Sequence, residues 1–314
     1  MKLAVKAKTI VAASAVLVTL AVWAASFAHG AAHSSAVDAS RAVPYAARFR
    51  EVEGRGLLVK VWVNGAGPYS FAVDTGAGAT ILSARVAGEA RVGVRRGSAV
   101  NIGGLSGASG GTGREAVVRE LAIGDADNLL PSRGAVIVTD SLPQDIDGVL
   151  DPVEAFWPLG FVIDPERHEL SAFDPRANPL RLGDAPAGGA TVAWIFNGGS
   201  RRPFVMLDGG RRALIDTGSG FGLAVSESAA RSLGLLPNEG RAREVVRDLG
   251  GGRVASRRIA PANVSIGELE LRSVPTDLLS GISAASPILL GREALAPFRL
   301  TFDPLHRLIQ LAPQ

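Results

Sequence analysis

Short stretches of alternating hydrophobic and polar residues, separated by glycine-rich turns, predict that most of this chain forms β-strands. Residues 58–63 alternate in this way, meet a turn at 64–67 and lead into a second predicted strand at 69–73. Two such strands joined by a tight turn are typical of a β-hairpin. The hairpin ends in Asp74-Thr75-Gly76, which predicts a sharp turn directly after a buried strand.

The same pattern returns about 140 residues later. Predicted strands at 204–207 and 213–215 precede Asp216-Thr217-Gly218, as in the first half. In both halves a serine follows at the position of a helix N-cap: Ser83 precedes a predicted helix at 84–90, and Ser226 precedes one at 227–233. The repeated order of strand, turn, strand, Asp-Thr-Gly and capped helix indicates a duplicated unit.

Both halves also end alike. Val149-Leu150-Asp151 and Leu289-Leu290-Gly291 precede short helices, and each half closes with strands around an Asp-Pro turn, at 164–165 and 303–304. We therefore predict a mostly β protein with a few short helices, built from two homologous lobes related by a pseudo-twofold axis. The predicted parts are a first lobe at 45–175, a Pro- and Gly-rich linker at 176–190 and a second lobe at 191–314.

Residues 1–30 differ from the rest in charge and hydropathy. Lys2, Lys6 and Lys8 precede an uninterrupted run of apolar or small residues, which is typical of a signal peptide. We expect the folded part to be periplasmic or secreted. The apolar run is also long enough to span a bilayer, so an uncleaved membrane tether through residues 10–28 is the alternative.

Charge and composition exclude several classes of protein. The chain has 33 Lys plus Arg against 30 Asp plus Glu, and the three lysines of the leader account for the excess, so no nucleic-acid partner is expected. The absence of cysteine excludes thiol nucleophiles, disulfides and Cys-ligated metals. His168 and His306, the histidines distant from the leader, lie after matching Asp-Pro turns. We expect no metal and no other cofactor.

Asp74 and Asp216 are the candidate catalytic residues. A pseudo-twofold axis would bring their loops together, and two carboxyl groups that close share one proton because like charges repel. The charged member can then activate water as a general base, while the protonated member donates to a carbonyl oxygen. Gly76 and Gly218 leave room for the facing loop. This pattern predicts hydrolysis of an amide bond without a metal or a histidine.

The segments 72–80 and 214–220, together with Leu289-Leu290-Gly291, resemble the aspartic peptidases of the pepsin and retropepsin superfamily. The closest likeness is to bacterial exported proteins with retropepsin-like domains, here two in one chain, and it spans roughly 45–313. It implies β-barrel lobes with a cleft between them, endopeptidase activity on a peptide or protein, and a monomer that supplies both aspartates. It also implies catalytic Asp74 and Asp216 with supporting Thr75, Gly76, Thr217, Gly218 and Ser219.

Two departures from this family leave an alternative open. Asp151 stands where the family has glycine, which places a third carboxyl group near the pair and keeps open a catalytically inactive, bilobal peptide-binding protein. The candidate flaps over the cleft, at 102–113 and 248–258, contain no aromatic residue. A third class, a structural scaffold exported from the cytoplasm, would require both Asp-Thr-Gly turns to be coincidental.

One difference between the two motifs predicts the order of ionisation. Ser219 follows the second motif where Ala77 follows the first, and a hydroxyl donor stabilises a neighbouring carboxylate. The sequence therefore predicts that Asp216 ionises first and that Asp74 carries the shared proton.

Overall fold

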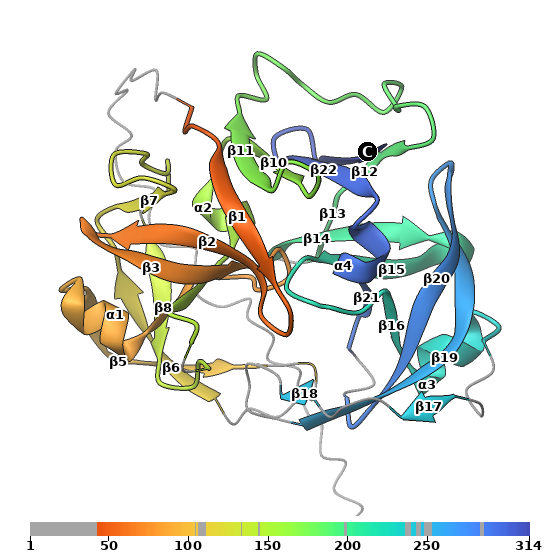
Figure 1. Ribbon diagram of the computed structural model, residues 1–314, viewed down its shortest axis with the longest axis horizontal. Coiled ribbons are helices and arrows are strands. Elements are labelled where there is room, and N and C mark those ends of the chain that lie inside the picture. Colours follow the sequence, from red (N-terminus) through yellow and green to blue (C-terminus); the bar gives the residue numbers. More distant parts are fainter. Residues whose placement is uncertain are drawn as a thin grey trace, which may run out of the picture. The chain divides into compact units, whose positions relative to one another are not determined.

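Strands dominate the computed structural model, as the alternating pattern predicted, and its helices are short (Figure 1). The structure describes residues 43–314 except 104, 106–110, 133, 144, 198–199, 236–239, 243–245, 248–252 and 283–285. The predicted leader and tether at 1–30 lie outside the described residues. Within the described part of the chain, no helix has the length and apolar character needed to cross a bilayer.

The first half contains eleven strands and two helices in the described residues. The strands are β1 (Ala47–Val52), β2 (Gly56–Val63), β3 (Ala66–Val73), β4 (Ile81–Ser83), β5 (Gly93–Ile102), β6 (Gly111–Val117), β7 (Leu121–Ile123), β8 (Ala135–Thr139), β9 (Gly148–Leu150), β10 (Gly160–Asp164) and β11 (Glu169–Phe173). The helices are α1 (Ala84–Glu89) and α2 (Pro152–Ala155).

The second half adds twelve strands, two α-helices and one 3-10 turn in the described residues. The strands are β12 (Ala190–Ala193), β13 (Ile195–Asn197), β14 (Ser200–Leu207), β15 (Arg211–Asp216), β16 (Leu223–Ser226), β17 (Arg241–Ala242), β18 (Val246–Arg247), β19 (Arg253–Ile266), β20 (Leu269–Ser280), β21 (Ile288–Gly291), β22 (Phe298–Asp303) and β23 (Leu308–Pro313). The helices are α3 (Glu227–Ser232), α4 (Arg292–Leu295) and the 3-10 turn η1 (Asp208–Gly210).

The same strand arrangement occurs in both halves and confirms the two homologous lobes. The hairpin β2–β3 matches β14–β15, and the second strand of each hairpin pairs in parallel with a later strand, β9 or β21. That later strand pairs antiparallel with β4 in the first half and with β16 in the second. Each lobe therefore holds its Asp-Thr-Gly turn at the end of a strand that has neighbours on both sides.

The helix caps predicted from serine are present in both halves. Ser83 Oγ accepts a hydrogen bond from Val86 N at the start of α1, and Ser226 Oγ accepts one from Ala229 N at the start of α3. Each bond satisfies a backbone N–H that has no partner within the helix, an effect worth about 1 kcal/mol.

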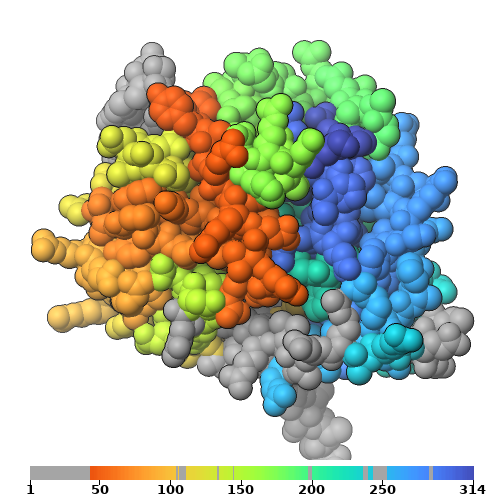
Figure 2. Space-filling model, viewed as in Figure 1, coloured from red at the N-terminus to blue at the C-terminus, as the bar shows by residue number. Residues whose placement is uncertain are grey.

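A shared sheet joins the two lobes. Strand β10 of the first half pairs antiparallel with β22 of the second, and both belong to a 14-stranded sheet. Phe161 and Phe302 are fully buried at this junction, where their rings stack with centroids 4.5 Å apart. Figure 2 shows the orange surface of the first half against the blue surface near the C-terminus. Both lobes consequently belong to one compact unit, Ala39–Gln314.

The chain between β11 and β12 forms turns without a helix or a strand. This segment contains the linker predicted at 176–190 except its last residue, Ala190, which begins β12. The lobe limits at 175 and 191 stay predictions, because strands from both sides of the linker share the same sheet.

Candidate active site

Asp74 and Asp216 are each placed by the end of a buried strand. Asp74 follows β3 directly, and its backbone N–H donates to Leu150 O at 3.0 Å. Asp216 is the last residue of β15, where it lies in parallel register with Gly291 of β21. The apolar residues before both aspartates are buried, so each carboxyl group is fixed at the edge of its lobe's core.

Thr75 and Thr217 join the two loops by a reciprocal set of hydrogen bonds. Thr75 Oγ1 donates to Ile215 O at 2.6 Å, and Thr217 Oγ1 donates to Val73 O at 3.1 Å. In return, Thr217 N donates to Thr75 Oγ1 at 3.1 Å and Thr75 N donates to Thr217 Oγ1 at 3.2 Å. Both side chains are buried, so water does not compete for these bonds. The structure thus brings together the two loops that the sequence placed in different lobes.

The two glycines of the motifs let each carboxyl group lie against the opposite loop. A Cβ on Gly218 would lie 2.4 Å from Asp74 Cγ, and a Cβ on Gly76 would lie 2.9 Å from Asp216 Cγ. Real Cβ atoms do not approach carbon this closely, so only glycine fits at either position.

The carboxyl groups of Asp74 and Asp216 lie close enough to affect each other's pKa. Burial raises the pKa of Asp74 from its ordinary value. Burial raises the pKa of Asp216 well above its ordinary value, and the negative charge of Asp74 raises it further. One proton therefore stays between the two groups under conditions in which isolated aspartates would have lost it.

The contact that was expected to set the order of ionisation differs from the one predicted. Ser219 Oγ accepts a hydrogen bond from Phe221 N at 3.3 Å, and the contact between Ser219 and Asp216 is made by the backbone N–H at 3.1 Å. Gly218 N also donates to Asp216 Oδ1, at 3.0 Å. These two donors lower the pKa of Asp216. Burial and the negative charge of Asp74 raise it by more, so the net shift is upward. Because the two carboxyl groups titrate as a pair, the order in which they ionise stays a prediction.

Asp151 supplies the third carboxyl group expected near the pair. Its side chain is buried and caps α2, where Oδ1 accepts from Val153 N at 2.9 Å. Its backbone N–H donates to Thr80 Oγ1 at 3.2 Å. Burial raises the pKa of Asp151 well above its ordinary value, and the charges of Glu154 and Asp74 raise it further. The glycine that the family has here is thus replaced by a carboxyl group that is bound to a helix and favoured in its neutral form.

Two arginines at the loops were not identified as site residues from the sequence. Arg292 NH1 donates to Thr217 O at 2.9 Å and to Gly218 O at 3.2 Å, behind the second loop. Arg202 NH2 donates to Ala77 O at 3.2 Å, behind the first. Both positive charges lower the pKa of Asp74. The position of Arg292 directly after Leu289-Leu290-Gly291 was an available signal, whereas Arg202 lies beside Arg201 in no motif that points to the site.

The flap predictions fall partly outside the described residues. Most of 104–110 and all of 248–252 are not described, and the strands that flank them form hairpins, β5 with β6 and β18 with β19. Leu105 O accepts a hydrogen bond from Ser286 Oγ at 3.0 Å, a contact between the two halves. A flap role for either segment stays a prediction.

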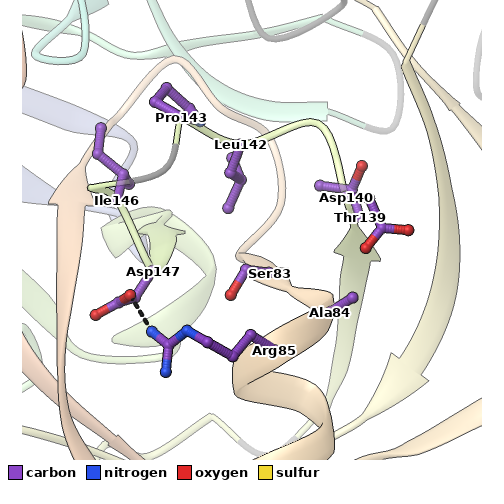
Figure 3. Close-up of a pocket in the computed structure, with 9 residues that line it drawn as sticks. All are labelled: Ser83, Ala84, Arg85, Thr139, Asp140, Leu142, Pro143, Ile146 and Asp147. Carbon is purple, nitrogen blue, oxygen red and sulfur yellow. Dashed lines mark hydrogen bonds and ion pairs between the residues drawn. The ribbon is translucent and has the colours of Figure 1, made fainter.

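A hollow of about 190 Å³ lies beside α1 and the loop that follows β8 (Figure 3). Ser83 and the ion pair of Arg85 with Asp147 lie on one side of it, and Leu142 extends from the loop. Leu142 packs against the same small buried cluster as Ala77 and Ala79, which follow the first motif. Asp74 and Asp216 do not line this hollow. It is therefore a surface feature next to the first loop rather than the site of the aspartate pair.

Comparison with known proteins agrees with this geometry. The aspartyl protease family model matches the chain twice, at residues 59–150 and 205–294. The two matches contain the two Asp-Thr-Gly motifs and the strands that position them. The comparison with curated proteins finds no match. The repeated match covers more than half of the sequence, and the chain belongs to the aspartyl protease family, with two retropepsin-like domains.

Proposed function

We propose that the protein is an aspartic endopeptidase in which Asp74 and Asp216 are the catalytic residues. The observation that carries the proposal is the packing of each carboxyl group against the glycine of the opposite loop, Asp74 against Gly218 and Asp216 against Gly76. A single proton shared by two buried aspartates provides a base and an acid in one site. Thr75, Gly76, Thr217, Gly218 and Ser219 support the two loops.

We assign the charged role to Asp74, because the nearby positive charges of Arg202 and Arg292 lower its pKa. Asp74, the charged member, takes a proton from a water molecule placed between the carboxyl groups. The water oxygen attacks the carbonyl carbon of the scissile amide, while Asp216 donates its proton to the carbonyl oxygen. The tetrahedral intermediate then collapses, the C–N bond breaks, and the leaving nitrogen takes a proton from Asp74. Asp216 recovers the proton from the hydroxyl group as the new carboxylic acid forms.

The substrate in this proposal is a peptide or protein, and the site needs no cofactor because the two carboxyl groups supply both proton transfers. The lysine-rich, apolar N-terminus supports a periplasmic or secreted location, either free or tethered through residues 10–28. One chain provides both aspartates, which supports action as a monomer.

A peptide-binding protein without catalytic activity is the second candidate. Asp151 favours it, because the corresponding position of the second lobe, Gly291, leaves no space for a side chain. A Cβ on Gly291 would lie 2.4 Å from Phe221 O. The first loop is therefore supported differently from the second, and a catalytic geometry shared by both loops depends on that support.

The test is to incubate the purified chain with a mixed peptide library from about pH 3 to pH 7, the range in which a carboxyl pair holds one proton. Asp74→Asn and Asp216→Asn are assayed in parallel. Cleavage that either substitution abolishes and that a statine-type transition-state mimic blocks supports the endopeptidase. Peptide binding without cleavage at any pH supports the second candidate, and neither binding nor cleavage contradicts both.

A further inference from the structure

The two Asp-Thr-Gly loops are held by different means at their backs. In the second half the first N–H groups of α4 hold the loop: Arg292 N donates to Ser219 O at 2.9 Å, and Glu293 N donates to Phe221 O at 3.1 Å. The first N–H groups of a helix have no partner within the helix, so they are available for such bonds. The backbone of α4 therefore fixes the loop that carries Asp216.

The first half cannot make the same bonds. Pro152 occupies the position of Arg292 and has no N–H to donate. Val153 occupies the position of Glu293, and its N–H donates to Asp151 Oδ1 at 2.9 Å. Asp151 thus caps α2 with its own side chain, and Ala77 O, the counterpart of Ser219 O, receives no bond from the helix backbone.

Arg202 replaces the missing donor from the opposite lobe. Its NH2 group donates to Ala77 O at 3.2 Å, although Arg202 belongs to β14 of the second half. The guanidinium lies so close to the loop that a Cβ on Gly78 would be 2.7 Å from its Nε atom. Gly78 also has φ +77°, a conformation that side chains rarely adopt. The loop is therefore shaped to receive this arginine.

The segment that carries Arg202 is fixed by neighbouring contacts. Trp194 Nε1 lies within hydrogen-bonding distance of Arg201 O and Arg202 O, at 3.0 and 3.1 Å. Arg201 pairs with Glu154 of α2 at 2.8 Å and lies over the ring of Trp157, 4.1 Å from its centroid. These contacts hold β14 against α2, so the guanidinium of Arg202 reaches the first loop from a defined position.

We propose that Arg202 is a positioning residue for Asp74: it supplies across the lobe interface the hydrogen bond and the positive charge that α4 and Arg292 supply to the second loop. The inference rests on the proposed function and extends it. In this arrangement the roles of Asp151, Pro152 and Arg202 depend on one another. Pro152 has no N–H, and Asp151 takes the N–H of Val153, so Ala77 O has no donor from α2 and accepts from Arg202 instead. An enzyme of this kind requires contact between its lobes for the geometry of Asp74 as well as for the pairing of its aspartates.

The charges around the pair make the proposal testable through pH. Asp74 faces Asp216 and the guanidinium groups of Arg202 and Arg292, and Asp151 faces Glu154, Asp74 and Arg202. Arg202 lowers the pKa of both Asp74 and Asp151. Its removal therefore raises the pKa of Asp74, and the acidic limb of the pH–rate profile moves to higher pH. A purely structural contact would not produce this shift.

The experiment uses the full chain and compares R202M and R202K with R231M. Arg231 is a matched control because it lies on the exposed surface of α3 in the same half and pairs with Glu227. R202M is expected to lower kcat about 10- to 100-fold, as for a displaced catalytic group, with a smaller change in KM and an acidic limb at higher pH. R202K keeps the charge but not the planar donor group, so it retains the wild-type limb with a reduced kcat. R231M leaves both quantities unchanged.

A transplant separates positioning from folding. The double substitution D151G/P152R gives the first half the glycine and arginine of the second, including a backbone N–H at position 152. In the R202M background it is expected to restore kcat by about tenfold or more, whereas P152A, which restores only the N–H, gives a smaller gain. If R202M does not fold, R202K decides: a lowered kcat at an unmoved acidic limb supports the proposal, and an unchanged kcat overturns it.

Two results overturn the proposal. One is an R202M enzyme with unchanged kcat and acidic limb, and the other is a loss of kcat with an unmoved limb that D151G/P152R does not restore. Titration of the Asp74 carboxyl group by carbon-13 NMR measures the effect of Arg202 on the pKa of Asp74 directly. This measurement does not require the protein to cleave a substrate. If the wild-type chain cleaves no peptide, the proposed function fails. An upward shift of the Asp74 titration in R202M then still supports the role of Arg202, and no shift contradicts it.

Discussion

Gly218 and Asp74 come from opposite lobes, yet a Cβ on the glycine would lie 2.4 Å from the carboxyl carbon of the aspartate. In the reciprocal arrangement, a Cβ on Gly76 would lie 2.9 Å from the carboxyl carbon of Asp216. Each lobe therefore sets the position of the other lobe's carboxyl group by direct contact. The separation of the two aspartates is fixed by two glycines rather than by the aspartates themselves.

Gly218→Ala is accordingly expected to force the loops apart and to reduce peptide cleavage at least about 100-fold, since small displacements of reacting groups are costly. Gly88→Ala is the control: Gly88 lies within α1, where a Cβ meets nothing within 4 Å. That substitution is expected to stabilise the protein by about 0.5–1 kcal/mol and to leave cleavage unchanged. Kinetics together with urea unfolding measure both effects. Full activity of Gly218→Ala would contradict the packing of the loops.

The reciprocal bonds of Thr75 and Thr217 predict a difference between two substitutions of similar size. Thr75→Val keeps the shape of the side chain but leaves Ile215 O and Thr217 N without their partner, at an expected cost of about 1–3 kcal/mol. Thr75→Ser keeps the hydroxyl group and is expected to retain most of the activity. The free energy of unfolding and kcat are measured for both variants. Equal behaviour of the two would show that the hydroxyl bonds are unimportant.

Asp151 predicts how stability changes with pH. Burial raises the pKa of Asp151 well above its ordinary value, so the folded protein binds a proton more tightly than the unfolded chain. The stabilisation is complete below the unfolded pKa and is lost as the pH rises through the raised one. Asp151→Asn keeps the N-cap acceptor without the titration. The free energy of unfolding of this variant is therefore expected to fall less than that of the wild type as the pH rises towards neutral.

Urea unfolding of wild type and Asp151→Asn at a series of pH values tests this expectation. The difference between the two proteins is expected to grow with pH in favour of the asparagine variant. Parallel curves at all pH values would mean that Asp151 titrates normally. Glu227→Gln is a suitable control, because Glu227 lies on the exposed surface of α3.

The junction of the lobes predicts a cooperative protein. Phe302 is fully buried and stacks on Phe161 where β22 pairs with β10. Phe302→Ala is expected to cost about 3–5 kcal/mol, as for other large core residues. Both lobes are expected to unfold together, because they share a sheet. Two separate calorimetric transitions, in the wild type or the variant, would contradict a shared core.

Much of the fold followed from local patterns that occur twice. The hairpins before Asp74 and Asp216, the helices after Ser83 and Ser226, and the final strands of each half were all predicted from hydrophobic alternation, turn residues and caps. Each of these depends on residues near one another in sequence. The duplication then allowed the two loops to be placed face to face, because a pseudo-twofold axis relates equivalent segments.

The features that sequence reasoning missed depend on contacts across the interface. The bond from Arg202 to Ala77 O requires the exact placement of β14 against the first loop, which no local pattern encodes. The Ser219 hydroxyl group was predicted to act on Asp216, but its orientation towards Phe221 N is set by the turn itself. The shared sheet formed by β10 and β22 also joins segments that the sequence assigned to separate lobes.

The bonds between Thr75 and Thr217 have a consequence for biosynthesis. They join residues 142 positions apart, and the strand that supports Asp216, β21, lies near the C-terminus. Contacts between residues so distant in sequence form late, because a long loop must close first. A growing chain therefore holds Asp74 without a partner until the second half has folded. On the proposed function, the capacity to cut proteins arises only after β21 has been synthesised and has paired with β15, which protects the cell that makes the enzyme.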